Sequence, residues 1–342
     1  MKILIIRVGA MGDVLHALPA VAALHRARPE WEIDWVITPH WSPLVVNSDG
    51  KGPVVRLAQL AETKQWSKAP ASPATMRSIL KLRSALRAES YDLAVDMQGT
   101  LRSAVIGRMS RSGQLVGYSD PREPLAARFY KTRLERKGRH VIEQGAALLG
   151  EACGVALEPE GVELPHEEWA DNWAAEVVGD RQVCLLAASA GWASKCWAVE
   201  KYGALAVALK AMGMDVVVNA PRKDDALAAA VVEASGGTAR VVVCNVTGLI
   251  ALMRRTALVV GGDSGPTHLA AVLGIPLVAL FGPTNPERNG PRGPGEKIVL
   301  RDAASVTSYK RSGVADVGLA KISVETVLEA VRGWVGGGAH NL

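Results

Sequence analysis

The sequence predicts an α/β protein built from two Rossmann-like domains, each with a doubly wound parallel sheet. Apolar runs of strand length alternate with segments of helical apolar spacing along the whole chain. The alternation restarts after an acidic, proline-containing stretch near the middle. The 342 residues suffice for two domains, at roughly 100 to 200 residues each. We expect an N-terminal domain over residues 1–160 and a C-terminal domain over 161–342, with the last helix a candidate to pack back on the first domain.

The composition is that of a globular protein, with 49% hydrophobic and 21% charged residues. No stretch reaches the ~20 consecutive apolar residues that a membrane span requires, so no transmembrane segment is expected. The apolar part of the opening MKILIIRVGAMGD is too short for a signal peptide and predicts a strand. The four cysteines show no C-x-x-C spacing, which favours a reduced cytoplasm (Cys153, Cys184, Cys196 and Cys244).

In the first half, the apolar run from Lys2 to Arg7 predicts a strand that ends at a glycine turn. Apolar residues at helical spacing follow from Val14 to Arg26. Ser72 before Pro73 is typical of a helix start, and the pattern runs to about Glu89. The other elements expected in this half are strands at 31–37, 53–57, 91–97 and 115–118, and a helix at 140–153.

Residues 155–181 read as the connection between the halves and contain a short helix at 169–178. Beyond it, apolar runs predict five strands, at 182–188, 214–219, 240–244, 257–261 and 277–281. Helical spacing between and after them predicts helices at 199–212, 224–234, 247–255, 266–273 and 323–335. Ligands of such domains bind at the carboxyl ends of the strands, so we expect a site in a cleft between the halves.

A glycine-rich turn precedes the helix at 266–273 and carries an unusual density of polar groups. Asp263 and Ser264 are residue types that cap helices, and Thr267 and His268 follow within the next turn. Such a turn directs backbone N–H groups and the positive end of a helix dipole at one point, which suits a phosphate. The alternative is a well-capped helix with no ligand.

Three further residues are placed for chemistry. Asp13 follows the first strand near a helix N-terminus, where a carboxylate stays ionised and suits a general base or a metal ligand. The alternative for Asp13 is a plain helix cap. Lys195 lies in the small-residue loop after the first strand of the second half and is placed to neutralise a diphosphate. The alternative for Lys195 is an exposed structural lysine. Asp224, in the loop after the next strand, is a candidate for ribose hydroxyls.

The charge of the chain is unevenly distributed. Residues 101–140 hold ten Lys/Arg against three Asp/Glu, a balance of +7 that leaves −2 for the remainder. A surface for a strongly anionic partner and an ordinary solvated face both fit this balance. Nucleic acid is disfavoured because the segment has few aromatic residues to stack on bases.

Several enzyme classes lack their motifs here. Gly9-x-x-Gly12 has no G-x-G spacing, and the second strand ends without a ribose-binding acid, which makes a dehydrogenase a weak interpretation. No Cys/His cluster, no paired carboxylates at metal spacing and no G-x-S-x-G occur. We therefore expect no metal and no cofactor.

Several of these segments resemble the lipopolysaccharide heptosyltransferases of glycosyltransferase family 9. The matching segments are Gly12-Asp13-Val14, Asp96-Met97-Gln98-Gly99, Arg122-Glu123-Pro124-Leu125-Ala126, Lys195-x-Trp197, the block DSGPTHLA from Asp263 to Ala270, and Phe281-Gly282-Pro283-Thr284. The match runs from Met1 to about Arg288, and the DSGPTHLA block is quite specific to the family. MGDVLHALPA, DMQGTLRSA and REPLA look most like members that add the first heptose to the inner core.

The resemblance implies a GT-B fold, with the acceptor bound by the first domain and the nucleotide-sugar by the second. It implies inverting, metal-independent transfer without a cofactor, with Asp13 as the base and Lys195 compensating the charge on the leaving ADP. The implied donor-binding residues are Ser189, Asp224, Asp263, Ser264, Gly265, Thr267, His268 and Thr284. The implied acceptor-binding residues are Gly12, Asp96, Gln98, Arg122 and Arg128.

The implied partners are ADP-heptose and a Kdo-lipid A acceptor, used by a cytoplasmic protein associated peripherally with the inner membrane. Three alternatives stay open. One is a family 9 transferase for a later heptose or another sugar. Another is a sugar-nucleotide epimerase of similar architecture, which needs a second acid/base such as Asp96. The third is a nucleotide- or polyanion-binding protein in which Asp13 only caps a helix.

Overall fold

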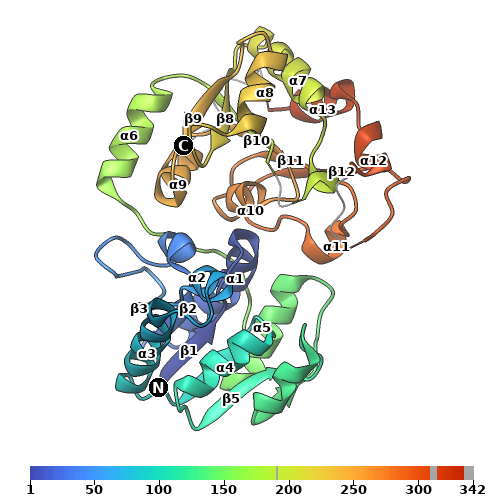
Figure 1. The fold of residues 1–342 in the computed structure, drawn as a ribbon. Coiled ribbons are helices and arrows are strands. Elements are labelled where there is room, and N and C mark those ends of the chain that lie inside the picture. Colours follow the sequence, from blue (N-terminus) through green and yellow to red (C-terminus); the bar gives the residue numbers. More distant parts are fainter. Residues whose placement is uncertain (190–191, 309–313, 335–342) are drawn as a thin grey trace. The chain divides into compact units, whose positions relative to one another are not determined.

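The computed structural model describes residues 1–189, 192–308 and 314–334 (Figure 1). The chain divides into two compact units, Met1–Pro165 and His166–Leu342. Each unit contains one six-stranded parallel sheet with helices on its faces. The predicted α/β class with two parallel sheets is therefore confirmed.

The first sheet has the strand order β3-β2-β1-β4-β5-β6. Its strands are β1 Lys2–Ile6, β2 Glu32–Ile37, β3 Leu57–Leu60, β4 Leu93–Asp96, β5 Gln114–Tyr118 and β6 Thr132–Leu134. β1 is central because it pairs with both β2 and β4, and its residues from Ile3 to Ile6 are fully buried. All six strands run parallel, so the turns that follow them gather at one edge.

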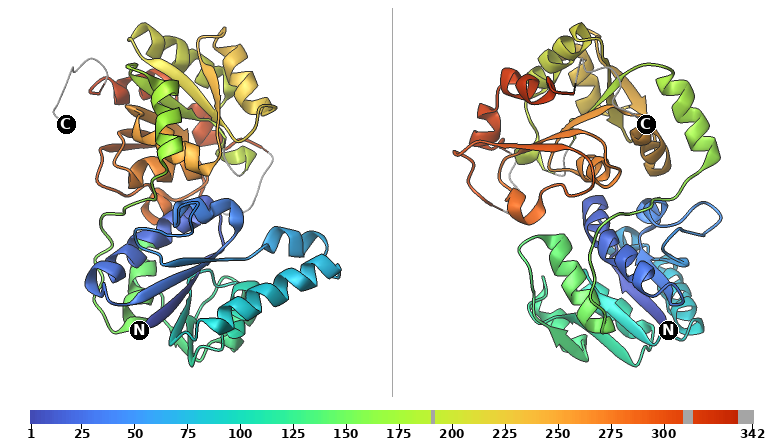
Figure 2. Two further views of the ribbon diagram at one scale, coloured as in Figure 1. Left: turned by 90° about the vertical axis from the view of Figure 1, so that its left-hand side faces the viewer. Right: turned by 180° about the vertical axis from the view of Figure 1, so that it is seen from behind.

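Helices cover both faces of this sheet (Figures 1 and 2). They are α1 Met11–Ala27, α2 Thr63–Lys68, α3 Pro73–Ala88, α4 Leu101–Met109 and α5 Val141–Cys153, with 3₁₀ turns η1 Pro39–Leu44 and η2 Pro124–Phe129. Leu82 and Leu86 of α3 and Ile106 of α4 share a core with the sheet on one face. α1 and α5 pack on each other on the opposite face, which is turned towards the viewer in the right-hand view of Figure 2.

The second sheet has the order β12-β11-β10-β7-β8-β9, which is the same doubly wound topology. Its strands are β7 Val183–Ala187, β8 Asp215–Ala220, β9 Arg240–Val243, β10 Leu258–Gly262, β11 Leu277–Phe281 and β12 Lys297–Arg301. The helices are α6 Glu168–Val178, α7 Val199–Ala211, α8 Ala226–Ala234, α9 Val246–Arg254, α10 Gly265–Val272, α11 Pro286–Asn289, α12 Val317–Lys321 and α13 Val324–Val331, with the 3₁₀ turn η3 Ala193–Lys195.

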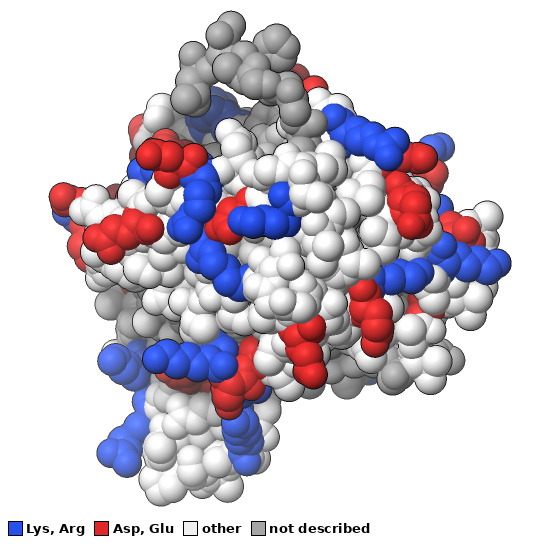
Figure 3. Space-filling view, turned by 90° about the horizontal axis from the view of Figure 1, so that it is seen from above, with Lys and Arg blue, Asp and Glu red and all other residues white. Residues whose placement is uncertain are grey.

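The last described helix, α13, packs within the second unit. It lies on α7 and β11, and its Val327 and Val331 are fully buried in the core that β7, β10 and α7 share. Its apolar face is therefore covered there. Among the described residues, no helix combines the length and the apolar character needed to cross a bilayer. Over most of the face in Figure 3, cationic and anionic side chains are interspersed, as the modest net charge of +5 suggests.

The strong local patterns gave the right elements. The predicted helix start at Ser72 is confirmed, because the Ser72 hydroxyl accepts a hydrogen bond from the Thr75 N–H at 3.1 Å. The strand expected at 53–57 is wrong in position. The observed strand is β3, in which Leu57 pairs with Asp34 of β2. Arg56, the residue before β3, uses its guanidinium to pair with the buried Asp34 carboxylate at 2.5 Å.

The short edge strands β6 and β12 and the helix α4 were not predicted. β6 has only three residues, all partly or fully exposed, and β12 alternates exposed and half-buried positions. Edge strands bury less apolar surface than central ones, so they carry a weaker apolar signal. In α4, the apolar residues are broken up by arginines, serine and glycine.

Candidate active site

In the first unit, Asp13 lies in the first turn of α1, directly after Gly12 and the turn that follows β1. Its Oδ2 accepts a hydrogen bond from the Ala10 backbone N–H at 3.2 Å. Its Oδ1 pairs with the Arg7 guanidinium at 2.8 Å. Asp13 is therefore not the N-cap residue, which is Ala10, and only one of its oxygens takes part in capping the helix. Because 37% of the Asp13 side chain is exposed, its carboxylate remains accessible.

Arg7 joins the ends of two neighbouring strands. While one of its nitrogens pairs with Asp13, another donates to the Met97 backbone carbonyl in the turn after β4. The Arg7 side chain is only 19% exposed. A guanidinium held at both ends fixes the direction in which the carboxylate of Asp13 points. Nothing in the sequence pattern indicates this role of Arg7, which is predicted only as the last residue of a strand.

Gly9 lets this turn approach η1. Its φ of 142° lies in a region that residues other than glycine rarely adopt. A Cβ at this position would also lie 2.7 Å from the Trp41 ring. The glycine is therefore required for the turn to pass over the tryptophan. Thr38, just before η1, lies near the same point.

Asp96 is fully buried at the end of β4. Its Oδ1 accepts from the N–H groups of Gln98 (2.9 Å) and Gly99 (3.0 Å), and its Oδ2 accepts from the hydroxyls of Ser103 (2.8 Å) and Tyr130 (2.7 Å). Burial raises the pKa of Asp96, and these four hydrogen bonds oppose that rise. Asp96 therefore shapes the turn. Gln98 in turn accepts from the Val8 N–H at 3.2 Å, which links the β4 turn to the β1 turn.

The segment that contains Arg122 is attached to this same turn. The Glu123 N–H donates to the Gly99 carbonyl at 2.9 Å, and the Glu123 carboxylate accepts from the Leu101 N–H at 2.8 Å. Arg122 and Arg128 are both exposed. The structure thus brings the backbone of Arg122 beside the β4 turn, while Arg128 lies further along η2.

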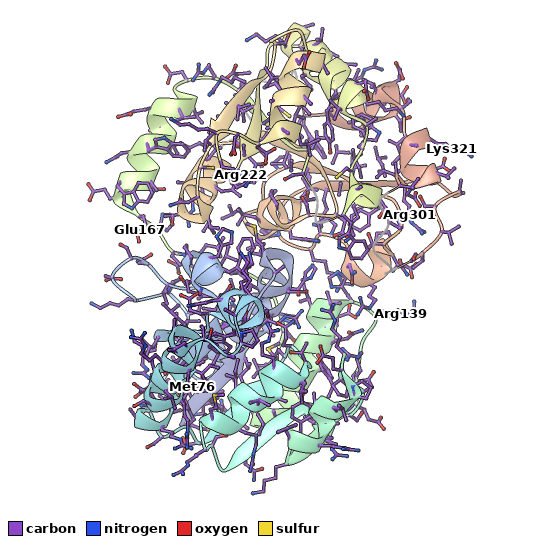
Figure 4. The ribbon with its side chains drawn as sticks, in the orientation of Figure 1. Met76, Arg139, Glu167, Arg222, Arg301 and Lys321 are labelled. Atoms are coloured by element: carbon purple, nitrogen blue, oxygen red, sulfur yellow. The ribbon has the colours of Figure 1, made fainter. Side chains whose placement is uncertain are left out.

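Part of the predicted basic segment is neutralised. Arg136 pairs with Asp120 at 3.2 Å and lies over the Tyr118 ring, 3.9 Å from its centroid. Lys137 pairs with Glu151 at 2.7 Å. Arg139, labelled in Figure 4, is exposed just before α5. The +7 balance therefore overstates the free positive charge of residues 101–140.

A pocket of about 440 Å³ opens at the ends of β2 and β3, and sequence reasoning missed it. It is lined by Thr38, Pro39, His40, Glu62, Thr63 and Lys64. The Thr38 hydroxyl is buried and has no hydrogen-bond partner among the described residues. Burial and the nearby Lys64 lower the pKa of His40. Since β2 adjoins β1, this pocket belongs to the same sheet edge as Asp13.

In the second unit, Lys195, Asp263 and His268 form one cluster. The Lys195 Nζ lies 2.5 Å from the Asp263 Oδ2, and the His268 Nε2 lies 3.0 Å from the Oδ1. The three side chains are 14%, 9% and 5% exposed, respectively. Burial alone would raise the pKa of Asp263, but the hydrogen bond from His268 and the attraction of Lys195 hold that pKa well below its usual value.

Glycines at the end of β10 allow this cluster to form. A Cβ on Gly262 would lie 2.7 Å from the Lys195 carbonyl oxygen, and one on Gly261 would lie 2.6 Å from the Ala187 Cβ. The loop after β7 is also anchored by Trp197, which is 2% exposed and donates to the Ile322 carbonyl at 3.0 Å. Close approach and this anchor together bring Lys195 to Asp263.

The start of α10 differs from the expected capped helix. Ser264 occupies the N-cap position, but its side chain makes no capping hydrogen bond. Its hydroxyl lies 3.2 Å from the Thr267 Oγ1, which donates to the Gly262 carbonyl at 2.6 Å. Asp263 bonds to Lys195 and His268 instead. The alternative of a helix capped by these side chains is therefore wrong, and the first-turn N–H groups of Gly265 and Thr267 are not capped by Ser264.

The remaining predicted donor residues lie at the same sheet edge without joining the cluster by a hydrogen bond in the described part of the chain. Ser189 is half-buried just after β7. Asp224, after β8, is 81% exposed and pairs with Arg222 (labelled in Figure 4) at 3.4 Å. Thr284, after β11, is 1% exposed, and its hydroxyl has no partner among the described residues.

The chain is similar to known proteins over most of its length. The profile of glycosyltransferase family 9 (heptosyltransferase) matches residues 79–314. Lipopolysaccharide heptosyltransferase 1 of Pseudomonas aeruginosa is 30% identical over 309 residues, covering 86% of this chain and 82% of that protein. The protein of the same name from Escherichia coli K12 is 27% identical over 304 residues, covering 87% of this chain and 93% of that protein.

Solved structures establish the fold. The E. coli heptosyltransferase WaaC with ADP superposes with a TM-score of 0.80 at 23% identity, covering 97% of this chain and 99% of that chain. The UDP-GlcNAc 2-epimerase from Methanocaldococcus jannaschii is a weaker match, with a TM-score of 0.51 at 14% identity, covering 99% of this chain and 94% of that chain. The predicted GT-B fold is confirmed. On the family profile and the extent of these matches, the chain belongs to glycosyltransferase family 9.

Proposed function

We propose that this protein transfers a heptose from ADP-heptose to a Kdo sugar of Kdo-lipid A, inverting the anomeric centre and using no metal ion. The relatives named lipopolysaccharide heptosyltransferase 1 support heptose transfer to lipopolysaccharide, and the solved WaaC complex with ADP-2-deoxy-2-fluoro heptose supports the donor. The observation that carries the proposal is the Lys195–Asp263–His268 cluster beside the start of α10.

In the proposed donor site, Lys195 and the N–H groups at Gly265 and Thr267 hold the diphosphate. Asp263 directs the Lys195 ammonium, since the two groups are 2.5 Å apart and both largely buried. A cation in a partly buried site interacts strongly with the negative charge that develops on the leaving ADP. One such preorganised donor accelerates a reaction by about 100- to 1000-fold. This is the role that a divalent cation fills in other transferases.

The other donor residues complete this proposal. The exposed Asp224 carboxylate is assigned to the ribose hydroxyls, for which its two oxygens are suitable acceptors. The Thr284 hydroxyl, buried and unpartnered in the described part of the chain, is assigned to the donor, as are Ser189 and the Ser264 hydroxyl. A buried hydroxyl without a partner costs free energy that a bound ligand would recover.

In the proposed acceptor site, Asp13 takes the proton from the attacking hydroxyl. The hydroxyl oxygen then forms a bond to the anomeric carbon while the bond from that carbon to the ADP phosphate oxygen breaks. A single displacement inverts the configuration at that carbon. Gly12, Gln98, Arg122 and Arg128 are assigned to the acceptor, and Asp96 acts through the turn that it shapes.

The epimerase alternative is less well supported. It needs a second acid/base near the sugar, and Asp96 was the candidate. Asp96 has no exposed surface, and four hydrogen bonds occupy its carboxylate. Transfer to a later heptose is the second candidate function, favoured by the 26% identity over 289 residues to an E. coli lipopolysaccharide heptosyltransferase 3.

The test is incubation with ADP-heptose and Kdo-lipid A, followed by mass measurement of the glycolipid. We expect a mass gain of one heptose and release of ADP that requires the acceptor. A changed sugar-nucleotide with no change in the glycolipid would favour the epimerase instead. Transfer only to an acceptor that already carries heptose would favour the later step. We place the reaction at the cytoplasmic face of the inner membrane, where the acceptor is anchored.

A further inference from the structure

Helices α2 and α3 form a second basic surface, separate from residues 101–140. Residues 63–88 contain six Lys/Arg and no Asp or Glu, a balance of +6. The six are Lys64, Lys68, Arg77, Lys81, Arg83 and Arg87. All but Arg87 are exposed, and Arg87 is half-buried. The two helices are joined by the Trp66 Nε1, which donates to the Ser78 hydroxyl at 3.1 Å.

The outer face of α3 is both cationic and apolar. The helix buries Thr75, Leu82 and Leu86 against the sheet. On the solvent side, Met76 is 55% exposed and Leu80 is 48% exposed, although both are large apolar residues (Met76 is labelled in Figure 4). Their spacing of four places them on one stripe of the helix.

The cations of α3 surround that apolar pair. Arg83 and Arg87 lie seven and eleven positions after Met76, which continues its stripe towards the C-terminus. Arg77 and Lys81 each follow one position after Met76 and Leu80, so they border the stripe on its solvent side. We call this set of six residues on α3 the docking face: Met76, Arg77, Leu80, Lys81, Arg83 and Arg87.

These cations have no anionic partners. Within the described ranges, no carboxylate lies within 4.0 Å of the Lys or Arg side chains of the docking face or of Lys64 and Lys68. Desolvation first, and then the neighbouring Arg111 and Arg83, lower the pKa of Arg87, which indicates that the guanidinium groups repel one another. By contrast, Arg136 and Lys137 are each paired with a carboxylate.

We propose that the docking face, with Lys64 and Lys68 of α2, binds the anionic phospholipid surface of a membrane. Such a surface offers negative charge to the unpaired cations and an apolar layer to Met76 and Leu80. A polynucleotide would neutralise the cations but would leave Met76 and Leu80 exposed to water. In addition, α3 contains no aromatic residue that could stack on bases. The helix would lie in the plane of the interface, without spanning it.

The test is co-sedimentation with vesicles of phosphatidylethanolamine and phosphatidylglycerol, with pure phosphatidylcholine vesicles for comparison. We expect binding to the anionic vesicles only, weakened by salt. The double variants Met76→Asp/Leu80→Asp and Arg77→Glu/Lys81→Glu should each bind at least about tenfold more weakly, since one basic residue near such a surface contributes roughly fivefold. Val207→Asp on α7 is the matched control, because Val207 is an exposed apolar helix residue (49%) outside the docking face.

Unchanged vesicle binding in either double variant, or equal binding to phosphatidylcholine, would overturn the proposal. The proposal would also be overturned if the variants lost affinity for duplex DNA and no form of the protein bound vesicles. All the substituted side chains are exposed, and circular dichroism shows whether each variant folds, so either pair decides the question alone. The assay needs neither sugar donor nor acceptor, so its result and that of the proposed function are independent.

Discussion

Two aspartates follow the central strands of the two sheets, and their surroundings assign them different roles. Asp13 pairs with Arg7 but keeps 37% of its side chain exposed, so a substrate hydroxyl can reach it. Asp263 is 9% exposed and bonds to Lys195 and His268. An accessible carboxylate suits a base, whereas an enclosed one suits the orientation of a cation. Sequence spacing alone treats both as polar residues after a strand.

We predict that Asp13→Asn loses transfer but keeps the fold and the donor affinity. The amide oxygen still accepts the hydrogen bond of the Ala10 N–H, so the start of α1 is preserved. What it lacks is the ability to take a proton, and removal of a general base costs about 100- to 10,000-fold in rate. The measurements are kcat and the affinity for ADP. If more than half of the turnover remained, Asp13 would be only a helix cap.

A second residue-scale prediction concerns stability in acid. The pKa of Asp263 in the folded protein lies below its ordinary value of about 3.9, so its ionised form stabilises the fold above that pH. This contribution is lost as the pH falls from about 4 towards the folded-state pKa. Asp263→Asn should therefore lower the free energy of unfolding near neutral pH, with a difference from wild type that shrinks below about pH 4.

Denaturant titration near neutral pH and at about pH 3 measures the difference in the free energy of unfolding between Asp263→Asn and wild type. The matched control is Asp224→Asn, because the Asp224 side chain is 81% exposed and should contribute little at either pH. A loss of stability in Asp263→Asn that stayed constant down to about pH 3 would show that packing, rather than ionisation, is responsible.

At the scale of elements, the site depends on where backbones pass close to each other. Gly262 lets the carbonyl of Lys195 approach β10, and Gly9 lets the β1 turn cross Trp41. Both glycines appear in the sequence as turn residues. Their partners lie tens of residues away, so the sequence could not identify which contact each of them permits.

We predict that Gly262→Ala weakens donor binding. Its Cβ would lie 2.7 Å from the Lys195 carbonyl oxygen, so η3 must move and the Lys195–Asp263 pair must lengthen. Overpacking of this kind costs about 1–3 kcal/mol in stability. Calorimetric titration with ADP measures the loss of affinity. Gly333→Ala is the control, since nothing lies within 4 Å of its Cβ position. Equal ADP affinity in the two variants would contradict the role given to Gly262.

The central elements were predictable from sequence and the peripheral ones were not. β1, β4, β7, β10 and β11 are fully or almost fully buried, and their continuous apolar runs gave the expected strands. The edge strands β6 and β12 lacked such runs. At the site, polar density identified Asp263 and His268, but the pocket at Thr38 and the role of Arg7 depend on residues brought together only by the sheet.

At the scale of the whole molecule, the two units repeat one topology and separate the chemistry. Each sheet has the same doubly wound order, and the polar groups lie in the turns after the central strands. The proposed base belongs to the first unit and the proposed leaving-group cation to the second. Charge is divided likewise, since both basic surfaces, residues 101–140 and 63–88, belong to the first unit.

We predict that transfer activity survives EDTA. In the proposal, Lys195 and the N–H groups at the start of α10 compensate the charge on ADP. The described ranges also hold no group of three His, Cys, Asp or Glu side chains placed to bind a metal ion. Initial rates with and without EDTA test this. Activity that EDTA abolishes and added magnesium or manganese restores would contradict it.

The last prediction separates the two basic surfaces by function. Arg122 lies beside the β4 turn, where the acceptor is proposed to bind, and Arg128 is exposed further along η2. Reversing both charges, in Arg122→Glu/Arg128→Glu, should raise the KM for a phosphorylated acceptor and leave the KM for ADP-heptose nearly unchanged. Each cation near an anionic group contributes roughly fivefold in affinity, and salt screens the attraction beyond about 10 Å, so raised salt should mimic the variant.

The control is Arg77→Glu/Lys81→Glu, which changes the docking face by the same charge. With a lipid-free acceptor only the first variant should show a raised acceptor KM, because membrane binding no longer concentrates the substrate. A rise in the donor KM instead, or an equal response of both variants, would make residues 101–140 an ordinary solvated surface.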